Sequence, residues 1–389
     1  MNLVDIAEFF SERGGGVRSY LSDLAREGSS RGHRVTVIAP GPRDEVCSWN
    51  GGELVRLRGP AMPYDPTYHA LLRWSDVRAL LDRLRPDVVQ ASAPYAAAHL
   101  VASLEGPRRV HVWHSDQLGT YAGPLLERLP AAARSRAERM LGAWPRGLSR
   151  RFDATITPSL AVAEELRSRG CERVVPVVFG VRREGFSPER RSPTLRRALL
   201  GASADHPRAA LLVVACRLAF EKRVALVLEA ARVLAERRPV ALAVLGEGPE
   251  RRRLERQARS WPWVTFLGFE RDRGRYASIL ASADVLVHGG HAETFGFVLA
   301  EALASGTPVV VPASGAALDV ARLGAGATYP RGASPPQVAE AIEEVLQRDR
   351  AWWTPRTAAA AAALPSVSDH FDRLFALHEA LLAGRPLPR

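Results

Sequence analysis

Lysine is almost absent from this chain of 389 residues, because 52 of its 53 basic residues are arginine and Lys222 is the single lysine. Cysteine is scarce too. Cys47, Cys171 and Cys216 are far apart and odd in number, which excludes a disulfide framework or a cysteine metal cluster and fits a reducing cytosol. No apolar run reaches the ~18 residues of a membrane-spanning helix, and the N-terminus lacks the features of a secretory signal. The sequence therefore predicts a cytoplasmic protein.

The composition is that of an ordinary folded protein. Hydrophobic residues make up 47% and charged residues 24%, which excludes disorder as the main state. At roughly 150 residues per domain, the length predicts two domains. The net charge of +11 is uneven, because residues 1–200 carry 30 basic and 22 acidic side chains. We therefore expect the N-terminal half to meet an anionic partner. A strong arginine excess is typical of GC-rich coding, so we expect no nucleic-acid partner.

Short apolar segments alternate with segments of helical spacing along most of the chain. Such alternation is typical of parallel βαβ units and predicts α/β, doubly wound, Rossmann-like sheets. The pattern stops at residues 180–207, which are rich in proline and arginine, and then restarts. We therefore predict Rossmann-like domains at 1–179 and 208–364, a linker at 180–207, and a C-terminal helix within 365–389 that returns to the first domain. The ligand should lie at the carboxyl ends of the strands, in a cleft between the domains.

Two glutamates, Glu293 and Glu301, flank the start of a predicted helix in the run HAETFGFVLAEALASG. A helix N-terminus presents free N–H groups and the positive end of the helix dipole, which suits a phosphate. Gly296 lets a ligand approach the backbone closely. Glu301 can accept the two hydroxyl hydrogen bonds of a ribose, and Glu293 can do the same for a hexose. The alternative is a pair of solvated glutamates, although Glu301 lies in an apolar run where an unpaired carboxylate would be costly.

Arg217 and Lys222 follow the predicted strand ALLVVACRL. Arginine offers a fork of donors that fits a phosphate, and lysine offers a compact, mobile charge. Together they could neutralise a departing diphosphate, which transfer of a sugar from a nucleotide requires. The only lysine of the chain falls here, which favours a functional role over the alternative of a surface pair at a strand end.

Several runs together resemble one enzyme family. The spacing of Glu293 and Glu301 resembles the signature of retaining glycosyltransferases of family 4, which have the GT-B fold. GGGVRSYL is similar to the family's first glycine-rich loop, WHSD to its histidine strand, and FGVRREGFSP to its interdomain segment. CRLAFEK resembles its Arg–Lys motif, LGEGP its GDGP turn, and WVTFLGF its nucleobase strand. VHGGHAETFG most resembles the subgroup of GDP-mannose-dependent α-mannosyltransferases and sulfoquinovosyl lipid synthases.

The resemblance implies a role for each matching residue. The implied catalytic group consists of residues that contact the sugar or neutralise the diphosphate: His114, Arg217, Lys222 and Glu293. The implied donor-binding residues lie in the glycine turns, the nucleobase strand and the helix start: Gly15, Gly16, Gly246, Glu247, Gly248, Phe269, Thr294, Phe295, Gly296, Phe297 and Glu301. On the acceptor side, it implies Arg18, Tyr20 and Asp116.

The resemblance also implies the reaction. We expect a retaining, metal-independent hexosyltransferase that moves a sugar from a nucleotide diphosphate to a hydroxyl, with GDP-mannose as the first choice and an α-linked product. No Asp-x-Asp motif occurs, so we expect neither a metal nor another cofactor. The alternatives are a UDP-hexose-dependent transferase acting on a lipid or small molecule, a non-catalytic nucleotide-sugar binding protein, and a phosphorylase that carries pyridoxal phosphate on Lys222.

Residues 125–148 form a predicted helix in which arginines lie among apolar residues such as Trp144 and Leu148. Seven basic and two acidic side chains give the window 127–151 a net charge of +5. Basic amphipathic helices with tryptophan can lie on anionic lipid, which would predict a peripheral contact with the inner face of the membrane and a lipid-linked acceptor. The alternative is a helix that packs its apolar stripe on the core of the N-terminal domain.

Overall fold

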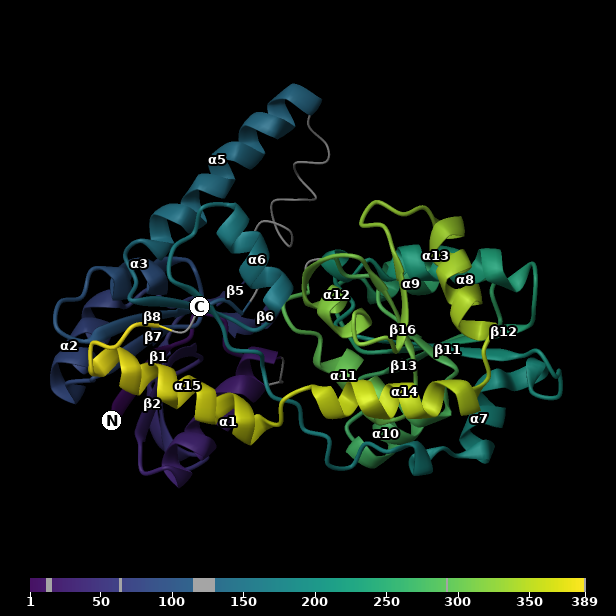
Figure 1. The fold of residues 1–389 in the computed structure, drawn as a ribbon, viewed down its shortest axis with the longest axis horizontal. Coiled ribbons are helices and arrows are strands. Elements are labelled where there is room, and N and C mark those ends of the chain that lie inside the picture. Colours follow the sequence, from purple (N-terminus) through teal and green to yellow (C-terminus); the bar gives the residue numbers. More distant parts are fainter. Residues whose placement is uncertain (12–15, 63–64, 115–129, 292, 388–389) are drawn as a thin grey trace. The chain divides into compact units, whose positions relative to one another are not determined.

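The structure, a computed structural model, describes residues 1–11, 16–62, 65–114, 130–291 and 293–387 (Figure 1). The chain divides into two compact units. Unit 1 comprises Met1–Gly180 and Val367–Arg389, and unit 2 comprises Val181–Ser366. Each unit is described by itself below.

Unit 1 is built on a sheet with the strand order β10-β9-β8-β7-β1-β2-β4-β3, in which only the pair β3 and β4 is antiparallel among the described strands. β7 and β9 are buried throughout, as expected for parallel strands that are covered on both faces. The strands are β1 Asn2–Ile6, β2 Arg34–Gly41, β3 Glu45–Trp49, β4 Gly52–Arg58, β7 Val88–Ala91, β8 Arg108–Val112, β9 Ala154–Thr157 and β10 Val174–Pro176; β5 Ala61–Met62 and β6 Asp65–His69 form a separate pair.

Helices cover both faces of this sheet (Figure 1). Val4 and Ile6 of β1 belong to one hydrophobic cluster with residues of α2, α3 and α5. Their neighbours Leu3 and Asp5 point to the opposite face, because side chains alternate along a strand. The helices are α1 Gly16–Ser30, α2 Trp74–Leu84, α3 Ala96–Ala102, α5 Ala131–Ser149, α6 Leu160–Ser168 and α15 Val367–Leu382.

Unit 2 contains a second, fully parallel sheet with the order β13-β12-β11-β14-β15-β16. Alternate residues of β11 enter two different clusters, with Leu212 and Val214 on one face and Leu211 and Val213 on the other. The strands are β11 Ala210–Ala215, β12 Val240–Leu245, β13 Val264–Gly268, β14 Val285–Val287, β15 Val309–Pro312 and β16 Gly326–Tyr329. The helices are α7 Pro193–Leu200, α8 Val224–Ala235, α9 Arg251–Gln257, α10 Arg273–Ser282, α11 Phe297–Ala304, α12 Gly315–Ala321, α13 Pro335–Leu346 and α14 Arg350–Ala363.

The stretch predicted as a linker, 180–207, is mostly part of unit 2. It contains α7, which begins with Pro193 after the capping residue Ser192. Leu195, Leu199 and Leu200 pack against the hydrophobic cluster on one face of the second sheet. The sequence analysis missed this short amphipathic helix because arginine and proline dominate the segment and only the leucines of the helix face the core.

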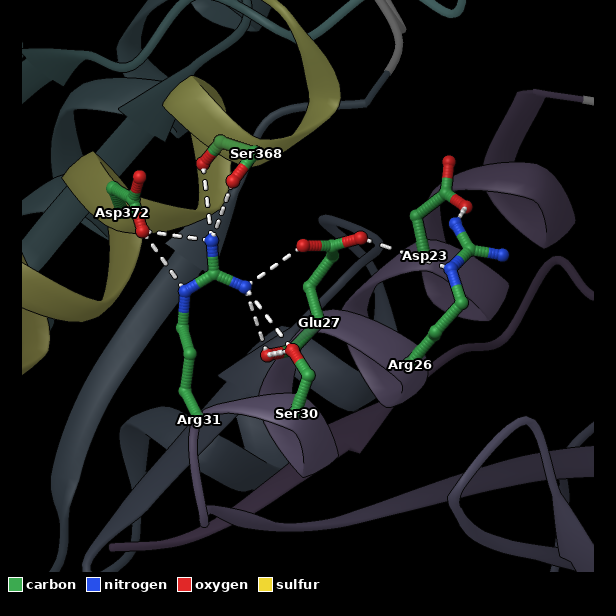
Figure 2. Close-up of polar contacts among 7 residues, drawn as sticks. All are labelled: Asp23, Arg26, Glu27, Ser30, Arg31, Ser368 and Asp372. Carbon is green, nitrogen blue, oxygen red and sulfur yellow. Dashed lines mark hydrogen bonds and ion pairs between the residues drawn. The ribbon is translucent and has the colours of Figure 1, made fainter.

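The C-terminal helix α15 belongs to unit 1 and lies beside α1 (Figures 1 and 2). Arg31, just after α1, donates from Nε and Nη2 to Asp372 Oδ1 at 2.8 and 2.7 Å and from Nη2 to Ser368 Oγ at 2.9 Å (Figure 2). Gly28 lets α1 pack closely against β2 and α15. A Cβ at this position would lie 2.4 Å from Val35 Cγ2 and 3.4 Å from Phe375. The chain thus ends on the domain in which it begins.

We predict that acid weakens unit 1 through the buried histidines of this contact. His378 is 0% exposed, and burial lowers its pKa from 6.5 to about 3, with His33 and His370 adding to the effect. Its contribution to stability is therefore full above pH 6.5 and falls as the pH drops toward 3. The midpoint of thermal unfolding should fall between pH 7 and pH 5, and His378→Leu should reduce this fall.

The control is His99→Leu, which removes an exposed histidine of the same unit. Differential scanning calorimetry at pH 7 and pH 5 measures the unfolding midpoints of wild type, His378→Leu and His99→Leu. An equally steep fall in wild type and His378→Leu would contradict the prediction.

Candidate active site

Three loops of unit 2 leave the carboxyl ends of neighbouring strands. β12, β11 and β14 are adjacent and parallel, so the loops 246–250, 216–223 and 288–296 begin at the same edge of the sheet. The backbone joins the first two loops, because Leu218 N donates to Glu247 O at 2.8 Å. The third loop touches the second at Gly289, where a Cβ would lie 2.7 Å from Lys222 O. The residues of these loops that the sequence predicts to bind the sugar donor thus lie at one edge of the unit 2 sheet.

Gly246 and Gly248 are required by the close packing of these loops. Both have positive φ, at 124° and 157°. A Cβ at Gly246 would lie 1.9 Å from Cys216 O, and one at Gly248 would lie 2.3 Å from Leu218 O. The side chain of Glu247, between them, pairs with Arg251. Both glycines therefore let the turn lie directly against the loop that carries the predicted phosphate-binding residues.

Lys222, Glu293 and His288 form a compact charged cluster. Lys222 Nζ lies 2.7 Å from Glu293 Oε2, and His288 Nε2 lies 3.3 Å from the same oxygen. Burial alone would raise the pKa of Glu293, but the charge of Lys222 and the contact with His288 outweigh it and hold that pKa well below its usual range. Burial likewise acts to lower the pKa of Lys222, but Glu293 more than offsets it and the pKa is raised. Both members of the pair are therefore ionised at neutral pH.

Arg217 lies on the more open side of this loop. Its Nη2 donates to Glu221 Oε1 at 2.9 Å, and its side chain is 39% exposed. The neighbouring Cys216 is not a nucleophile, because burial raises the pKa of its thiol to about 12. The loop thus offers a guanidinium and a partly buried ammonium, two kinds of charge that can bind a diphosphate.

α11 begins where the sequence predicts a helix start, directly after a glycine turn. Gly296 has a φ of 79° and precedes Phe297, the first residue of the helix. Thr294 and Phe295 are buried, and the Phe295 ring packs edge-on against Phe297, with centroids 4.7 Å apart. Glu293 O accepts a hydrogen bond from Ala316 N at 3.0 Å, which fixes the loop.

Glu301, on the second turn of α11, is held by Tyr276. The Tyr276 hydroxyl donates to Glu301 Oε2 at 2.9 Å, and Arg273 Nη2 lies 3.9 Å from Oε1. Burial raises the pKa of Glu301, and the Tyr276 hydrogen bond and Arg273 limit the rise. Tyr276 and His288 were not among the residues predicted from the sequence. His288 lies within the run VHGGHAETFG, and this motif could have indicated it. Tyr276 lies on α10, in a segment without a recognised motif, so no sequence pattern indicated it.

His114 follows β8 in unit 1, and its Nε2 lies 3.0 Å from Ser92 Oγ. Burial lowers its pKa to about 3, and His111 and His370 add to the effect. The ring is therefore neutral at any working pH, which suits a hydrogen bond to a sugar hydroxyl better than a charge interaction.

The remaining residues predicted for unit 1 have different positions. Tyr20 is only 3% exposed, stacks on Phe179 with ring centroids 4.7 Å apart, and lies edge-on to His114 at 4.6 Å. It supports His114 from the core rather than presenting its side chain to solvent. Arg18 is partly exposed on the first turn of α1, which begins at Gly16. Gly15 and Asp116 lie outside the described residues. In unit 2, Phe269 follows β13 and is 63% exposed.

The apolar stripe predicted within 127–151 partly belongs to the core of unit 1. Leu148 is 3% exposed, and Trp144 packs on the same hydrophobic cluster and stacks with Tyr95 at 6.1 Å. These contacts fit the alternative in which the apolar stripe packs on the core of unit 1. Residues 127–129 lie outside the described residues. No helix in the described part of the chain is long and apolar enough to cross a membrane.

Comparison with known proteins identifies the family. Residues 14–181 match the model described as Glycosyltransferase Family 4, and residues 202–361 match the model described as Glycosyl transferases group 1. The chain is 32% identical to a GDP-mannose-dependent alpha-(1-6)-phosphatidylinositol dimannoside mannosyltransferase of Mycobacterium tuberculosis over 90% of this chain and 88% of the relative. It is 28% identical to a GDP-mannose-dependent alpha-mannosyltransferase of Corynebacterium glutamicum over 82% of this chain and 74% of the relative. The chain belongs to glycosyltransferase family 4, which confirms the sequence prediction.

Solved structures confirm the predicted fold. Sucrose-phosphate synthase of Thermosynechococcus elongatus matches with a TM-score of 0.77 at 20% identity, over 99% of this chain and all of that chain. Anabaena HepE in complex with UDP and glucose matches with a TM-score of 0.69 at 18% identity, over 97% of this chain and 99% of that chain. The protein is thus a glycosyltransferase of the GT-B fold that uses a nucleotide sugar.

We predict that Tyr276→Phe weakens binding of a nucleoside diphosphate about ten-fold or more, since a hydrogen bond to a charged group contributes about 1.5–3 kcal/mol. Without the hydroxyl, the already raised pKa of Glu301 should rise further, so more of this carboxyl is protonated near neutral pH. Raising the pH from 6 to 8 should therefore restore part of the affinity. Titration calorimetry with GDP, UDP and ADP at both pH values measures this.

Ser278→Ala is the matched control, because it removes a hydroxyl from the same helix that donates only to Gly274 O. Equal affinities of wild type and Tyr276→Phe for the nucleotide that wild type binds most tightly would contradict the prediction.

Proposed function

We propose that this glycosyltransferase moves mannose from GDP-mannose to a lipid-linked hydroxyl acceptor, with retention of the α configuration and without a metal ion. One combination of observations carries the proposal. Relatives whose names specify GDP-mannose cover most of the chain, and the residues that match the family's donor motif lie together around Lys222. Names of several relatives also specify α-linked products, and one specifies a phosphatidylinositol-based acceptor.

The charges of unit 2 support a role in leaving-group departure. The C1–O bond to the diphosphate breaks, the acceptor oxygen forms the new bond to C1 on the same face, and its proton passes to the departing phosphate. Arg217, Lys222 and the N-terminus of α11 stabilise the negative charge that develops on that phosphate. Glu293 holds Lys222 before the donor arrives and accepts hydrogen bonds from sugar hydroxyls once it is bound. Glu301 accepts those of the ribose.

The charges of unit 2 support a reaction without a metal ion. Arg217 and Lys222 supply two positive charges where a diphosphate would otherwise require a divalent ion.

The surface of α5 supports a lipid-linked acceptor. Figure 1 shows the N-terminal half of this helix projecting from the rest of unit 1. Arg136, Arg146, Arg150 and Arg151 are exposed on or just after the helix. Each arginine near an anionic leaflet contributes about 1 kcal/mol, so a few of them could hold the protein reversibly at a membrane.

The donor and the stereochemistry are tested in one assay. Purified protein is incubated with GDP-mannose, UDP-glucose or ADP-glucose and a phosphatidylinositol mannoside acceptor, and the anomeric proton of the product is examined by NMR. We expect turnover with GDP-mannose, an α-linked product and full activity in excess EDTA. Lys222→Ala should reduce kcat/KM about 100-fold, because it removes a preorganised charge from the leaving group. A β-linked product would contradict retention of configuration. Preference for a UDP- or ADP-sugar would contradict GDP-mannose as the donor. Loss of activity in EDTA with rescue by Mg²⁺ would contradict metal independence.

Membrane contact is tested by liposome co-sedimentation with and without anionic lipid. Wild type should pellet with anionic liposomes at 0.1 M salt and not at 1 M, where the Debye length shrinks to about 3 Å. Changing Arg136, Arg146 and Arg151 to Ser should release the protein, because these side chains are exposed on or just after α5. The matched control changes Arg252, Arg256 and Arg259 of unit 2 to Ser, which removes the same charge elsewhere. If both triple variants pellet like wild type, α5 does not bind lipid.

A further inference from the structure

Unit 2 has a cavity of about 240 Å³ at the amino edge of its sheet. Three of its lining residues mark this edge, because Ala210 begins β11, Asp284 directly precedes β14 and Pro308 directly precedes β15. The strands are parallel, so this edge is opposite to the one at which the loops of Lys222 and Glu293 begin. We call it the arginine cavity, since its charged lining residues are Arg196, Arg238, Arg348, Arg350, Asp284 and Asp349.

Three guanidinium groups at this cavity share one carboxylate. Arg196 Nη2 lies 2.8 Å from Asp284 Oδ2, which also accepts a hydrogen bond from Leu211 N at 2.8 Å. Arg191 and Arg350 are close enough to Arg196 and Asp284 to interact with both electrostatically. Three positive charges and one negative charge leave this group with an excess of +2.

The other charged residues of the lining balance one another. Arg238 Nη1 lies 3.3 Å from Glu343 Oε1. Asp349 caps α14 by accepting a hydrogen bond from Trp352 N at 2.9 Å, and the Arg348 guanidinium lies over the Trp352 ring, 5.4 Å from its centroid. Each arginine here is matched by one acid, so these residues leave the excess of +2 unchanged.

The excess charge is partly withdrawn from water. Burial and the like charge of neighbouring arginines lower the pKa of Arg191 and of Arg350, although both remain charged. Arg350 makes long hydrogen bonds, from Nη1 to Ala283 O at 3.4 Å and from Nη2 to Ser305 O at 3.3 Å. Arg191 Nη1 is buried without a hydrogen-bond partner in the described part of the chain. A bound anion would offset the free-energy cost of this unsatisfied donor and of the repulsion.

A structural role accounts for two of the three arginines but not for the third. Arg196 Nη1 donates to Ser282 O at 3.0 Å, so this side chain, like Arg350, satisfies a backbone carbonyl at the end of a helix. Arg191 lies two residues before α7 and adds a third positive charge beside one acid. An apolar side chain would be cheaper to bury there, so stability alone does not explain Arg191.

The charge and the arrangement of these arginines favour a phosphate over a carboxylate. A phosphate monoester carries about −1.5 to −2 at neutral pH and offers three acceptor oxygens, which matches the excess of +2. A carboxylate carries one charge and two oxygens. The guanidinium groups come from separate places in the fold, before α7, on α7 and at the first residue of α14. Their forked donors fit the oxygens of a phosphate.

We propose that the arginine cavity binds a small phosphate-bearing anion, either inorganic phosphate or a phosphate monoester, through Arg191, Arg196 and Arg350. The site is additional to the loops at the carboxyl edge, and it does not depend on which sugar the enzyme transfers. A ligand that binds only the folded chain stabilises it by mass action, so occupancy of the cavity should stabilise unit 2.

The test combines titration calorimetry with thermal unfolding of the full chain. The probes are inorganic phosphate, mannose 6-phosphate and acetate at constant ionic strength. Both phosphates should bind wild type and raise its unfolding midpoint saturably, and acetate should not. Tighter binding of mannose 6-phosphate would support a monoester as the ligand, and tighter binding of inorganic phosphate would support the free ion.

Four variants locate the bound phosphate. Arg191→Met and Arg350→Met should each weaken its binding about ten-fold or more, because each removes charged hydrogen bonds to the anion. Arg197→Met is the matched control, since Arg197 lies on α7, is 66% exposed and pairs with Asp205. Arg217→Met removes a cation from the carboxyl edge instead. Neither of these two should change phosphate binding at the cavity.

Unfolding without phosphate separates binding from a structural role. Arg191→Met should then unfold at the wild-type temperature or above it, because it removes an unsatisfied donor and a repelling charge. This variant decides the test even if Arg350→Met, which loses two bonds to carbonyls, does not fold.

Three results would overturn the inference. The first is equal phosphate affinity of wild type and Arg191→Met, and the second is equal binding of acetate and phosphate. The third is an Arg191→Met midpoint that is lowered by the same amount with and without phosphate, which would make Arg191 purely structural. Loss of phosphate binding in Arg217→Met together with its retention in Arg191→Met would place the anion at the carboxyl edge and overturn the inference too. A donor other than GDP-mannose would contradict the proposed function alone.

Discussion

The ion pair between Lys222 and Glu293 is the interaction on which the carboxyl edge of the unit 2 sheet depends. It joins the loop after β11 to the loop after β14, and both partners are largely buried. Removing either partner would leave a buried charge uncompensated, which is strongly destabilising. The backbone is shaped around this contact, because Gly289 permits the approach to Lys222 and Gly315 leaves room for Glu293 O, which a Cβ would approach to 2.5 Å. The single lysine of the chain is thus a structural contact as well as a proposed ligand of the diphosphate.

The architecture, and the placement of Arg217, Lys222 and Glu293 at one edge of the unit 2 sheet, were predictable because their signals are local. Continuous apolar segments such as β11 indicate strands buried on both faces, and their alternation with helices is typical of parallel sheets. The glycines at 246 and 248 stand where positive φ and close backbone contact exclude other residues. Arg217, Lys222 and Glu293 could be placed at one edge because adjacent parallel strands share their carboxyl ends.

The contacts that the sequence did not reveal join distant segments. Tyr276 reaches Glu301 from another helix, and Ser92 bonds Asp5 across 87 positions of sequence. No local sequence pattern indicates such pairs. The clue for Asp5 was its position, a lone acid in the apolar strand NLVDI. Trp144 shows a limit of periodicity, since helical spacing predicts an apolar stripe but not whether the stripe faces the core or a membrane.

The two units hold a buried carboxyl group in contrasting ways. Glu293 has Lys222 as a partner and remains ionised, with a pKa well below its usual range. Asp5 has only the neutral donors Gln90 and Ser92, and burial raises its pKa from 3.8 to about 7. Glu293 therefore belongs to a charged cluster, whereas Asp5 belongs to a chain of neutral hydrogen-bond donors. The two acids differ because a cation lies beside Glu293 and only neutral donors lie beside Asp5.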